Sequence, residues 1–284
     1  MTEPIMKRGK GDGIEIQLAV WEGSGKDVLC VHGITANCRC WDVMASALSP
    51  AHRVIAMDLR GRGLSDRPDT GYSLEHHVRD ILALLDEQEI ERVVLMGHSL
   101  GAFIALAFAA EHPRRLERLV LVDGAGKLSP EQFDKVFAGI KPALDRLGKV
   151  FPSSGAYVDA MKNAPYMQPW SPAIETYYRY EIENTDGGVR CSIRPEHIAE
   201  EAENVRKEDP ASLYGRVGCS TLILRATNGL LQEDDILLPE PVVARMVAEI
   251  QDAVRFDVEG ANHYGIVFQP NEARDRALSS FIGA

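Results

Sequence analysis

The stretch that decides the fold is VVLMGHSLGAFIALAFAAEHP, residues 93–113. Residues 93–96 form a short apolar run, which predicts a buried strand. Residues 100–110 form an apolar helical run that a His-Pro pair ends. The segment GHSLG, residues 97–101, stands between them. The sequence therefore predicts a strand that turns directly into a helix, with Ser99 at the corner.

This corner has the form of a nucleophile elbow, the pattern G-x-S-x-G. A residue at such a sharp turn often takes unfavourable backbone angles, and flanking glycines keep neighbouring atoms out of the way. The turn lifts the serine hydroxyl above the sheet. Ser99 is therefore the candidate nucleophile, and serine in that role needs a general base within reach.

Composition sets broad limits on the function. The 284 residues are 45% apolar and 26% charged, with a net charge of −11, as in an ordinary globular protein large enough for one core and an inserted cap. No basic patch stands out, so no nucleic-acid partner is expected. No apolar run approaches the roughly 18 residues of a membrane span, and no secretory signal stands at the N-terminus. These features, with an odd number of cysteines, lead us to expect a cytoplasmic enzyme with reduced thiols.

Strands and helices alternate along most of the chain. Apolar strand patterns occur at 28–33, 93–96, 219–226 and 254–260, and amphipathic helices lie between them, as at 73–90. This order predicts an α/β fold with a mostly parallel sheet covered by helices on both faces.

The alternation stops after Gly126. Residues 128 to about 214 contain no good strand pattern and predict four helices, near 129–149, 154–163, 172–184 and 195–208. We therefore expect a core domain made of residues 1–126 and 215–284, and a helical cap or lid made of residues 127–214. The cap contains the aromatic residues Tyr166, Trp170, Tyr177, Tyr178 and Tyr180, which either line an acyl pocket or pack as core.

Four motifs follow one another in a fixed order: HG at 32–33, DLRGRGLSDRP at 58–68, GHSLG at 97–101 and NHYG at 262–265. In this order the chain resembles the α/β-hydrolase family, and in particular its capped serine esterase, lactonase and C–C hydrolase branch. The resemblance covers nearly the whole chain. It implies a small-molecule substrate and neither a metal nor an organic cofactor, and it gives the loop at 58–68 a structural role.

The resemblance also implies the general base and the oxyanion hole. His263 follows the last strand, on the loop where the family places its base. The backbone N–H groups of Leu100 and, after the strand at 28–33, of Ile34 are expected to bind the oxyanion. His98 lies beside Ser99 in the sequence and is expected to point away from it. His32 is expected to shape its loop rather than to react.

The acid of the triad has more than one candidate. Family members usually carry Asp shortly after the strand at 219–226, where this chain has Asn228-Gly229. Alignment from the following helix instead selects Asp235, with Asp234 and Glu233 as neighbours. Asp123, at the end of the strand before the cap, is the alternative because some family branches place the acid there. We favour Asp235 and retain Asp123 as the alternative.

These residues predict a serine hydrolase that cleaves carboxylic esters or lactones through an acyl-enzyme. Two other enzyme activities remain open: hydrolysis of C–C bonds in diketones, and cofactor-free perhydrolysis. A small-molecule receptor on a hydrolase scaffold is the non-enzymatic alternative. The sequence does not indicate the chain length of the substrate or the oligomeric state.

Overall fold

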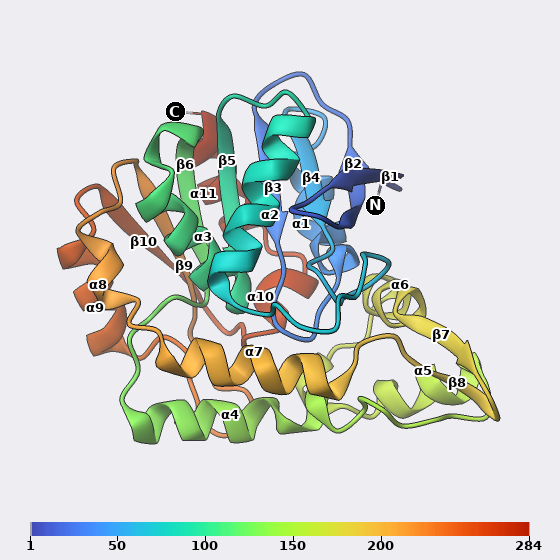
Figure 1. The fold of residues 1–284 in the computed structure, drawn as a ribbon. Helices are drawn as coiled ribbons and strands as arrows, with labels where there is room; N and C mark the ends of the chain where they lie inside the picture. Colours follow the sequence, from blue (N-terminus) through green and yellow to red (C-terminus); the bar gives the residue numbers. More distant parts are fainter. Residues whose placement is uncertain (1, 284) are drawn as a thin grey trace.

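The computed structural model describes residues 2–283 and contains an eight-stranded sheet with the order β1-β2-β4-β3-β5-β6-β9-β10 (Figure 1). β1 and β4 both pair with β2 in antiparallel fashion, and the other pairs are parallel. The predicted mostly parallel α/β sheet is confirmed. The strands are β1 (Ile5–Lys10), β2 (Glu15–Trp21), β3 (Asp27–Val31), β4 (Arg53–Met57), β5 (Val93–His98), β6 (Leu116–Val122), β7 (Ile182–Thr185), β8 (Gly188–Cys191), β9 (Thr221–Ala226) and β10 (Ala253–Val258).

Helices cover both faces of the sheet (Figure 1). One face packs against α2, α3 and α9, and the other against α1, α10 and α11. The α-helices are α1 (Asp42–Leu48), α2 (Leu74–Glu87), α3 (Leu100–Glu111), α4 (Pro130–Leu144), α5 (Ser154–Lys162), α6 (Pro172–Tyr180), α7 (Pro195–Lys207), α8 (Ala211–Tyr214), α9 (Glu240–Glu249), α10 (Gly265–Phe268) and α11 (Glu272–Gly283). Three short 3-10 helices are η1 (Cys38–Trp41), η2 (Pro113–Arg115) and η3 (Pro165–Met167).

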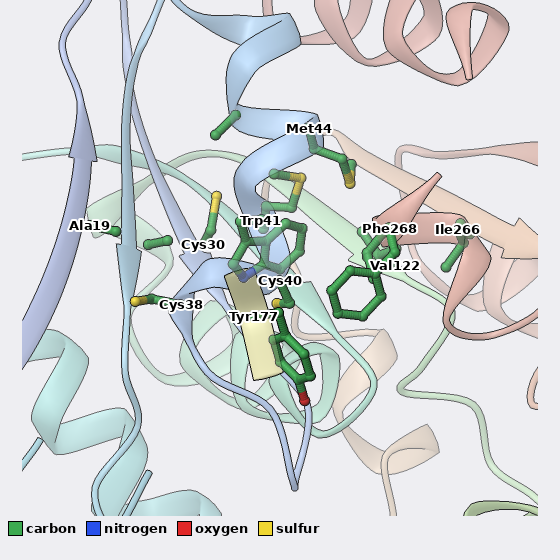
Figure 2. Packing of buried hydrophobic residues seen from close by; sticks show 14 of the residues in the cluster. Ala19, Cys30, Cys38, Cys40, Trp41, Met44, Val122, Tyr177, Ile266 and Phe268 are labelled. Carbon is green, nitrogen blue, oxygen red and sulfur yellow. The ribbon is translucent and has the colours of Figure 1, made fainter. Parts of the chain in front are cut away.

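The central strands are buried on both faces, which explains their continuous apolar sequences. In β3, Val28 and Cys30 pack into the cluster shown in Figure 2, whereas Leu29 and Val31 pack into the cluster on the opposite face. This alternation is the two-residue period of a strand. Figure 2 also shows Tyr177, from α6, beside Trp41 and Phe268, so one of the two clusters continues beyond the sheet.

Residues 127–214, here called the cap segment, lie across one end of the sheet, with α4 and α7 side by side (Figure 1). Helices are present in all four predicted regions. The prediction of no strand in this segment is wrong, because β7 and β8 form an antiparallel hairpin. The predicted helix at 172–184 accordingly ends at Tyr180. The cap segment as a separate domain stays a prediction.

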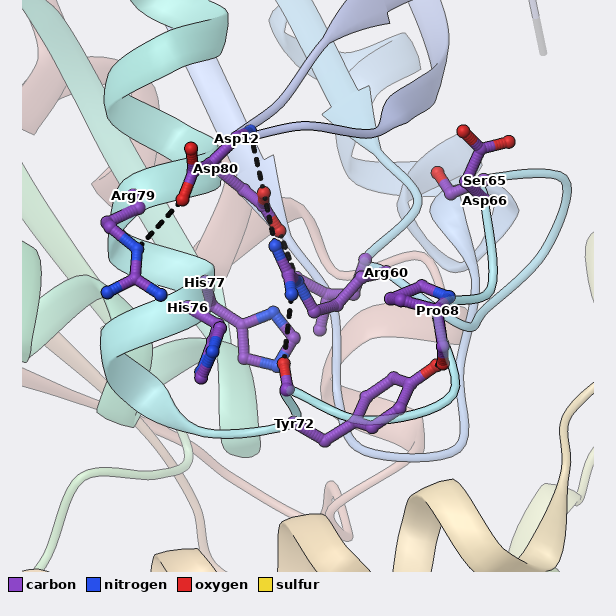
Figure 3. A network of polar contacts seen from close by, with 12 residues as sticks. Asp12, Arg60, Ser65, Asp66, Pro68, Tyr72, His76, His77, Arg79 and Asp80 are labelled. Atoms are coloured by element: carbon purple, nitrogen blue, oxygen red, sulfur yellow. Dashed lines mark hydrogen bonds and ion pairs between the residues drawn. The ribbon is translucent and has the colours of Figure 1, made fainter.

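The loop at 58–68 is held by ion pairs and hydrogen bonds, as the resemblance implied. The Arg60 guanidinium binds both carboxylate oxygens of the buried Asp80, at 2.7 Å each, and donates to the Gly71 carbonyl (Figure 3). Asp58 accepts hydrogen bonds from the backbone N–H groups of Cys38 and Leu64. The loop therefore connects the sheet, α2 and η1.

Between residues 2 and 283, none of the helices combines the length and the apolar character needed to cross a bilayer.

Candidate active site

Ser99 stands at the turn between β5 and α3, with φ 56° and ψ −119°. This is an unfavourable region for a residue with a side chain. Close packing on both sides of Ser99 requires glycine: a Cβ on Gly97 would lie 2.0 Å from the Gly101 carbonyl oxygen, and one on Gly101 would lie 2.0 Å from the Val31 carbonyl oxygen. The GHSLG segment thus has the strained strand–turn–helix geometry expected of an elbow.

His263 is paired with Asp123. The distance from His263 Nδ1 to Asp123 Oδ2 is 2.8 Å, and both side chains are buried. Because a carboxylate only accepts, Nδ1 donates in this contact, and Nε2 is the ring nitrogen that does not contact Asp123. The second Asp123 oxygen accepts from the Ala226 N–H at 3.1 Å. Asp123 itself, at the end of β6, has φ 45°.

The prediction that Asp235 would lie against His263 is therefore wrong. Asp235 is buried, but its carboxylate accepts the backbone N–H groups of residues 230–232 at 2.6, 2.9 and 3.1 Å. These hydrogen bonds hold the loop of residues 230–235 together. The Asp235 side chain faces α4, where a Cβ on Gly139 would lie 3.0 Å from Oδ2. Asp234 pairs with Lys135, and Glu233 is exposed. Asn228, at the usual place of the acid, donates to the Gly260 carbonyl.

His98 supports the loop that carries His263, a contact that the sequence interpretation missed. Its Nε2 lies 2.9 Å from the His263 carbonyl oxygen, and the two rings are 4.4 Å apart. Burial lowers the pKa of His98 well below its usual range, and the nearby His263 ring acts in the same direction. A neutral ring with its proton on Nε2 satisfies this contact, because a carbonyl only accepts. The sequence did offer a signal for this contact, because His98 stands at the end of a buried strand, beside Ser99.

His32 is also buried and neutral, and the hydrogen bonds of its ring nitrogens go to backbone groups. Nδ1 lies 2.8 Å from the Gly33 carbonyl oxygen, and Nε2 accepts the Leu59 N–H at 3.0 Å. Burial lowers the pKa of His32 to about 3. These contacts fit the expected structural role.

A cavity of about 540 Å³ reaches Ser99, and Ile34 and Leu100 contribute to its wall. The loop that contains Ile34 lies close to the serine, since a Cβ on Gly33 would be 3.2 Å from Ser99 Cβ. Leu100 begins α3, where the first N–H groups have no partner within the helix. The structure thus brings Ile34, Ser99 and Leu100 together.

No hydrogen bond joins the Ser99 hydroxyl to His263 among the described residues. In free enzymes this contact is often loose and tightens with substrate. His263 remains close to the elbow through His98, the immediate chain neighbour of Ser99.

The five aromatic residues that the sequence suggested for an acyl pocket do not line this cavity. Tyr166, Tyr177 and Tyr178 are buried in the core cluster, and Trp170 and Tyr180 pack against it. The sequence missed the true lining, which comes mainly from α4 and the loop before it, residues 124–129, with further residues from α7 and the start of α3. The signal was present as apolar residues at helical spacing in LSPEQFDKVFAGI, residues 128–140.

A family model described as "Alpha/beta hydrolase family" matches residues 28–276. The chain belongs to the α/β-hydrolase family. The match covers most of the chain, from β3 to α11, and the topology of the sheet agrees with it. Hydrolase activity is the coarse function that the family supports.

One similar protein spans nearly the whole chain, and a second spans less than half of it. The chain is 29% identical over 263 residues to 2-(acetamidomethylene)succinate hydrolase of Mesorhizobium japonicum, covering 93% of this chain and 90% of the relative. It is 37% identical over 135 residues to 2-hydroxymuconate semialdehyde hydrolase of Pseudomonas sp., covering 45% of this chain and 47% of the relative. The crystal structure of E-2-(acetamidomethylene)succinate hydrolase superposes with a TM-score of 0.86 at 27% identity, covering 99% and 100% of the two chains.

Proposed function

We propose that this protein is a serine hydrolase that cleaves carboxylic esters or lactones, with Ser99 as nucleophile, His263 as general base and Asp123 as the acid. The observation that carries the proposal is the His263–Asp123 pair, which orients the imidazole through Nδ1 beside a strained serine turn and leaves Nε2 outside the contact with the carboxylate. Serine at its own pKa is a poor nucleophile, so an oriented neutral imidazole is the group it requires.

The reaction follows from these positions. His263 Nε2 takes the hydroxyl proton as Ser99 Oγ attacks the carbonyl carbon, and the N–H groups of Ile34 and Leu100 bind the oxyanion that forms. The imidazolium then gives its proton to the leaving alcohol oxygen as the C–O bond breaks. Water then attacks the acyl-enzyme. His263 takes a proton from the water and gives it to Ser99 Oγ as the acyl bond breaks, which releases the acid and free Ser99.

The substrate is proposed to differ from that of the succinate-named relative. A dicarboxylate in a low-dielectric cavity needs cations to balance it. Every buried arginine among residues 2–283 already pairs with a carboxylate: the pairs are Arg60–Asp80, Arg62–Glu201, Arg146–Glu181, Arg225–Asp257 and Arg274–Asp275. We therefore favour neutral esters and lactones over dicarboxylates.

C–C bond hydrolysis is the second candidate, and the relative from Pseudomonas, a semialdehyde hydrolase, favours it. The two reactions share the serine and the base but differ in the leaving group, a carbanion equivalent instead of an alkoxide. A diketone substrate distinguishes them directly.

Turnover of a substrate panel tests the proposal. Wild-type protein is assayed with p-nitrophenyl esters, aliphatic lactones and vinylogous diketones, beside the variants Ser99→Ala and Ser279→Ala. Ser279 is an exposed serine on α11. We expect ester or lactone turnover, a loss of kcat of several orders of magnitude in Ser99→Ala, and no change in Ser279→Ala. Turnover of diketones alone would favour the second candidate. Ester turnover that survives in Ser99→Ala would contradict the proposed nucleophile.

A further inference from the structure

The cavity at Ser99 is lined partly by residues of a core cluster, such as Leu100, and partly by helix α4. It lies between the start of α3, which supplies Phe103, and helices α4 and α7 of the cap segment. Its volume of about 540 Å³ is within the range of small-molecule pockets, roughly 300–1,000 Å³. The cavity is thus large enough for more than the reacting ester group.

Helix α4 turns an apolar face toward this cavity. Phe133, Val136, Phe137 and Ile140 stand at positions i, i+3, i+4 and i+7, which is one face of a helix. All four are only half-buried, and none packs into the two clusters that form the core. An apolar helix face in this state is normally covered by something apolar.

Four charged residues line the cavity, Lys127, Asp134, Arg206 and Glu208, and all four are exposed. Arg206, on α7, pairs with Asp134 on α4, and both side chains are mostly exposed. The Arg206 guanidinium also lies 5.0 Å from the centre of the Phe133 ring. Lys127 pairs with Asp209 at 3.2 Å, and both are exposed. Each cation near the cavity is therefore already matched by an anion.

We propose that this cavity binds an unbranched apolar chain of a neutral ester or lactone, seated against the α4 face formed by Phe133, Val136, Phe137 and Ile140. The inference rests on the proposed function, because the reacting carbonyl must stand at Ser99. The chain belongs to either the acyl arm or the alcohol arm of the substrate. An anionic group in its place would lose its hydration without gaining a cation that is not already paired.

Chain length is the variable that tests this proposal. Two series are assayed with wild-type protein: p-nitrophenyl acyl esters from acetate to octanoate, and acetate esters of alcohols from ethanol to octanol. Burying one methylene contributes about 0.8 kcal/mol, so kcat/KM is expected to rise about fourfold for each added methylene in one series, until the cavity is filled. The series that rises identifies the arm. Equal or falling kcat/KM in both series, with the short esters still turned over, would overturn the proposal.

Two tryptophan variants on α4 provide the matched comparison. Val136→Trp places a large ring in the cavity, whereas Ala138→Trp places the same ring on an exposed position of the same helix. Val136→Trp is expected to lower kcat/KM for octyl substrates at least tenfold more than it lowers kcat/KM for the shortest ester. Ala138→Trp is expected to change both less than twofold. If Val136→Trp lowers kcat/KM equally for short and long substrates, the apolar chain of the substrate does not lie against α4.

Different results contradict the proposed function and the apolar-chain proposal. Absence of turnover for every ester and lactone contradicts the proposed function itself. Turnover of short esters without a chain-length effect contradicts only the apolar-chain proposal. Thermal unfolding of Val136→Trp checks its fold, and Val136→Ala repeats the test without added bulk: it should weaken kcat/KM for octyl substrates more than for the shortest ester.

Discussion

Asp123 and Asp235 are both buried carboxylates, yet they contact different groups. Asp123 contacts His263, and Asp235 contacts three backbone N–H groups of its own loop. The sequence favoured Asp235 because that residue stands at the expected number of residues before the next helix. The partner of a carboxylate depends on the path of the loop, which spacing does not give. The sequence motifs did locate the elbow and the loop of His263, and the catalytic roles of Ser99 and His263 stay predictions.

Asp123→Asn should lower kcat by a factor on the order of 10⁴ while the protein stays folded, because the amide no longer holds the proton on Nδ1. Asp235→Asn should cost less than tenfold in kcat, but it should lower the urea midpoint of unfolding, because three amides lose part of their acceptor. Steady-state kinetics and unfolding curves of both variants provide the comparison. The reverse ranking of kcat would return the acid to Asp235.

His98→Phe should keep the ring packing beside His263 and remove the hydrogen bond to its carbonyl oxygen. A net hydrogen bond is worth about 1 kcal/mol, so kcat should fall roughly fivefold if that contact orients the imidazole, with KM unchanged. His112→Phe, at the end of α3, is the control and should leave kcat unaltered. An equal loss in the two variants would argue against a positioning role for His98.

At the scale of the elements, the sheet and its helices followed from sequence pattern, and the β7–β8 hairpin did not. The hairpin strands have four residues each, which is too short for a clear period: β7 has one apolar residue, Ile182, and β8 has two, Val189 and Cys191. The turn between them, Asp186-Gly187, is a typical two-residue hairpin signal. This dipeptide indicates that the helix predicted at 172–184 must end earlier, near its observed end at Tyr180.

A buried charge cluster joins the cap segment to the core. Glu201, on α7, lies 2.5 Å from Arg62 and 2.8 Å from His77 of α2. Burial alone would raise the pKa of Glu201, but the neighbouring charges of His77 and Arg62 and their hydrogen bonds outweigh burial and lower it to about 2. The carboxylate therefore stays charged in the folded protein over most of the pH range.

Glu201→Gln should destabilise the protein by about 3–5 kcal/mol, since it leaves the Arg62 charge buried without its counterion. Glu203→Gln, which breaks an exposed pair with Lys207 on the same helix, should have no measurable effect. Urea unfolding at neutral pH measures both. A small effect of Glu201→Gln would mean that water or another group replaces the ion pair.

At the scale of the whole molecule, the fold class was predictable because both faces of the sheet are buried, so that each central strand appears as an unbroken apolar run. The residues that line the cavity were not predictable to the same degree. They depend on how the cap segment lies over the sheet, which no local pattern specifies.

Stability of the whole molecule should fall as the pH decreases. His32 has a folded pKa of about 3, below the roughly 6.5 of an unfolded chain. Between these two pKa values the unfolded chain binds a proton at His32 that the native state does not bind. The contribution of His32 to the free energy of unfolding is therefore complete above about pH 6.5 and declines toward pH 3. Each such histidine adds a slope of about 1.4 kcal/mol per pH unit. Urea unfolding from pH 7 to 4 should be steeper in wild type than in His32→Gln, and equal slopes would refute this origin.

The most direct test of the account is where a serine-directed reagent reacts. Wild-type protein and Ser99→Ala are treated with a fluorophosphonate, and the adduct is located by peptide mapping. The account predicts one stoichiometric adduct, on Ser99, and none in the alanine variant. An adduct on any other residue, undiminished labelling of Ser99→Ala, or an unreactive wild-type protein would contradict it.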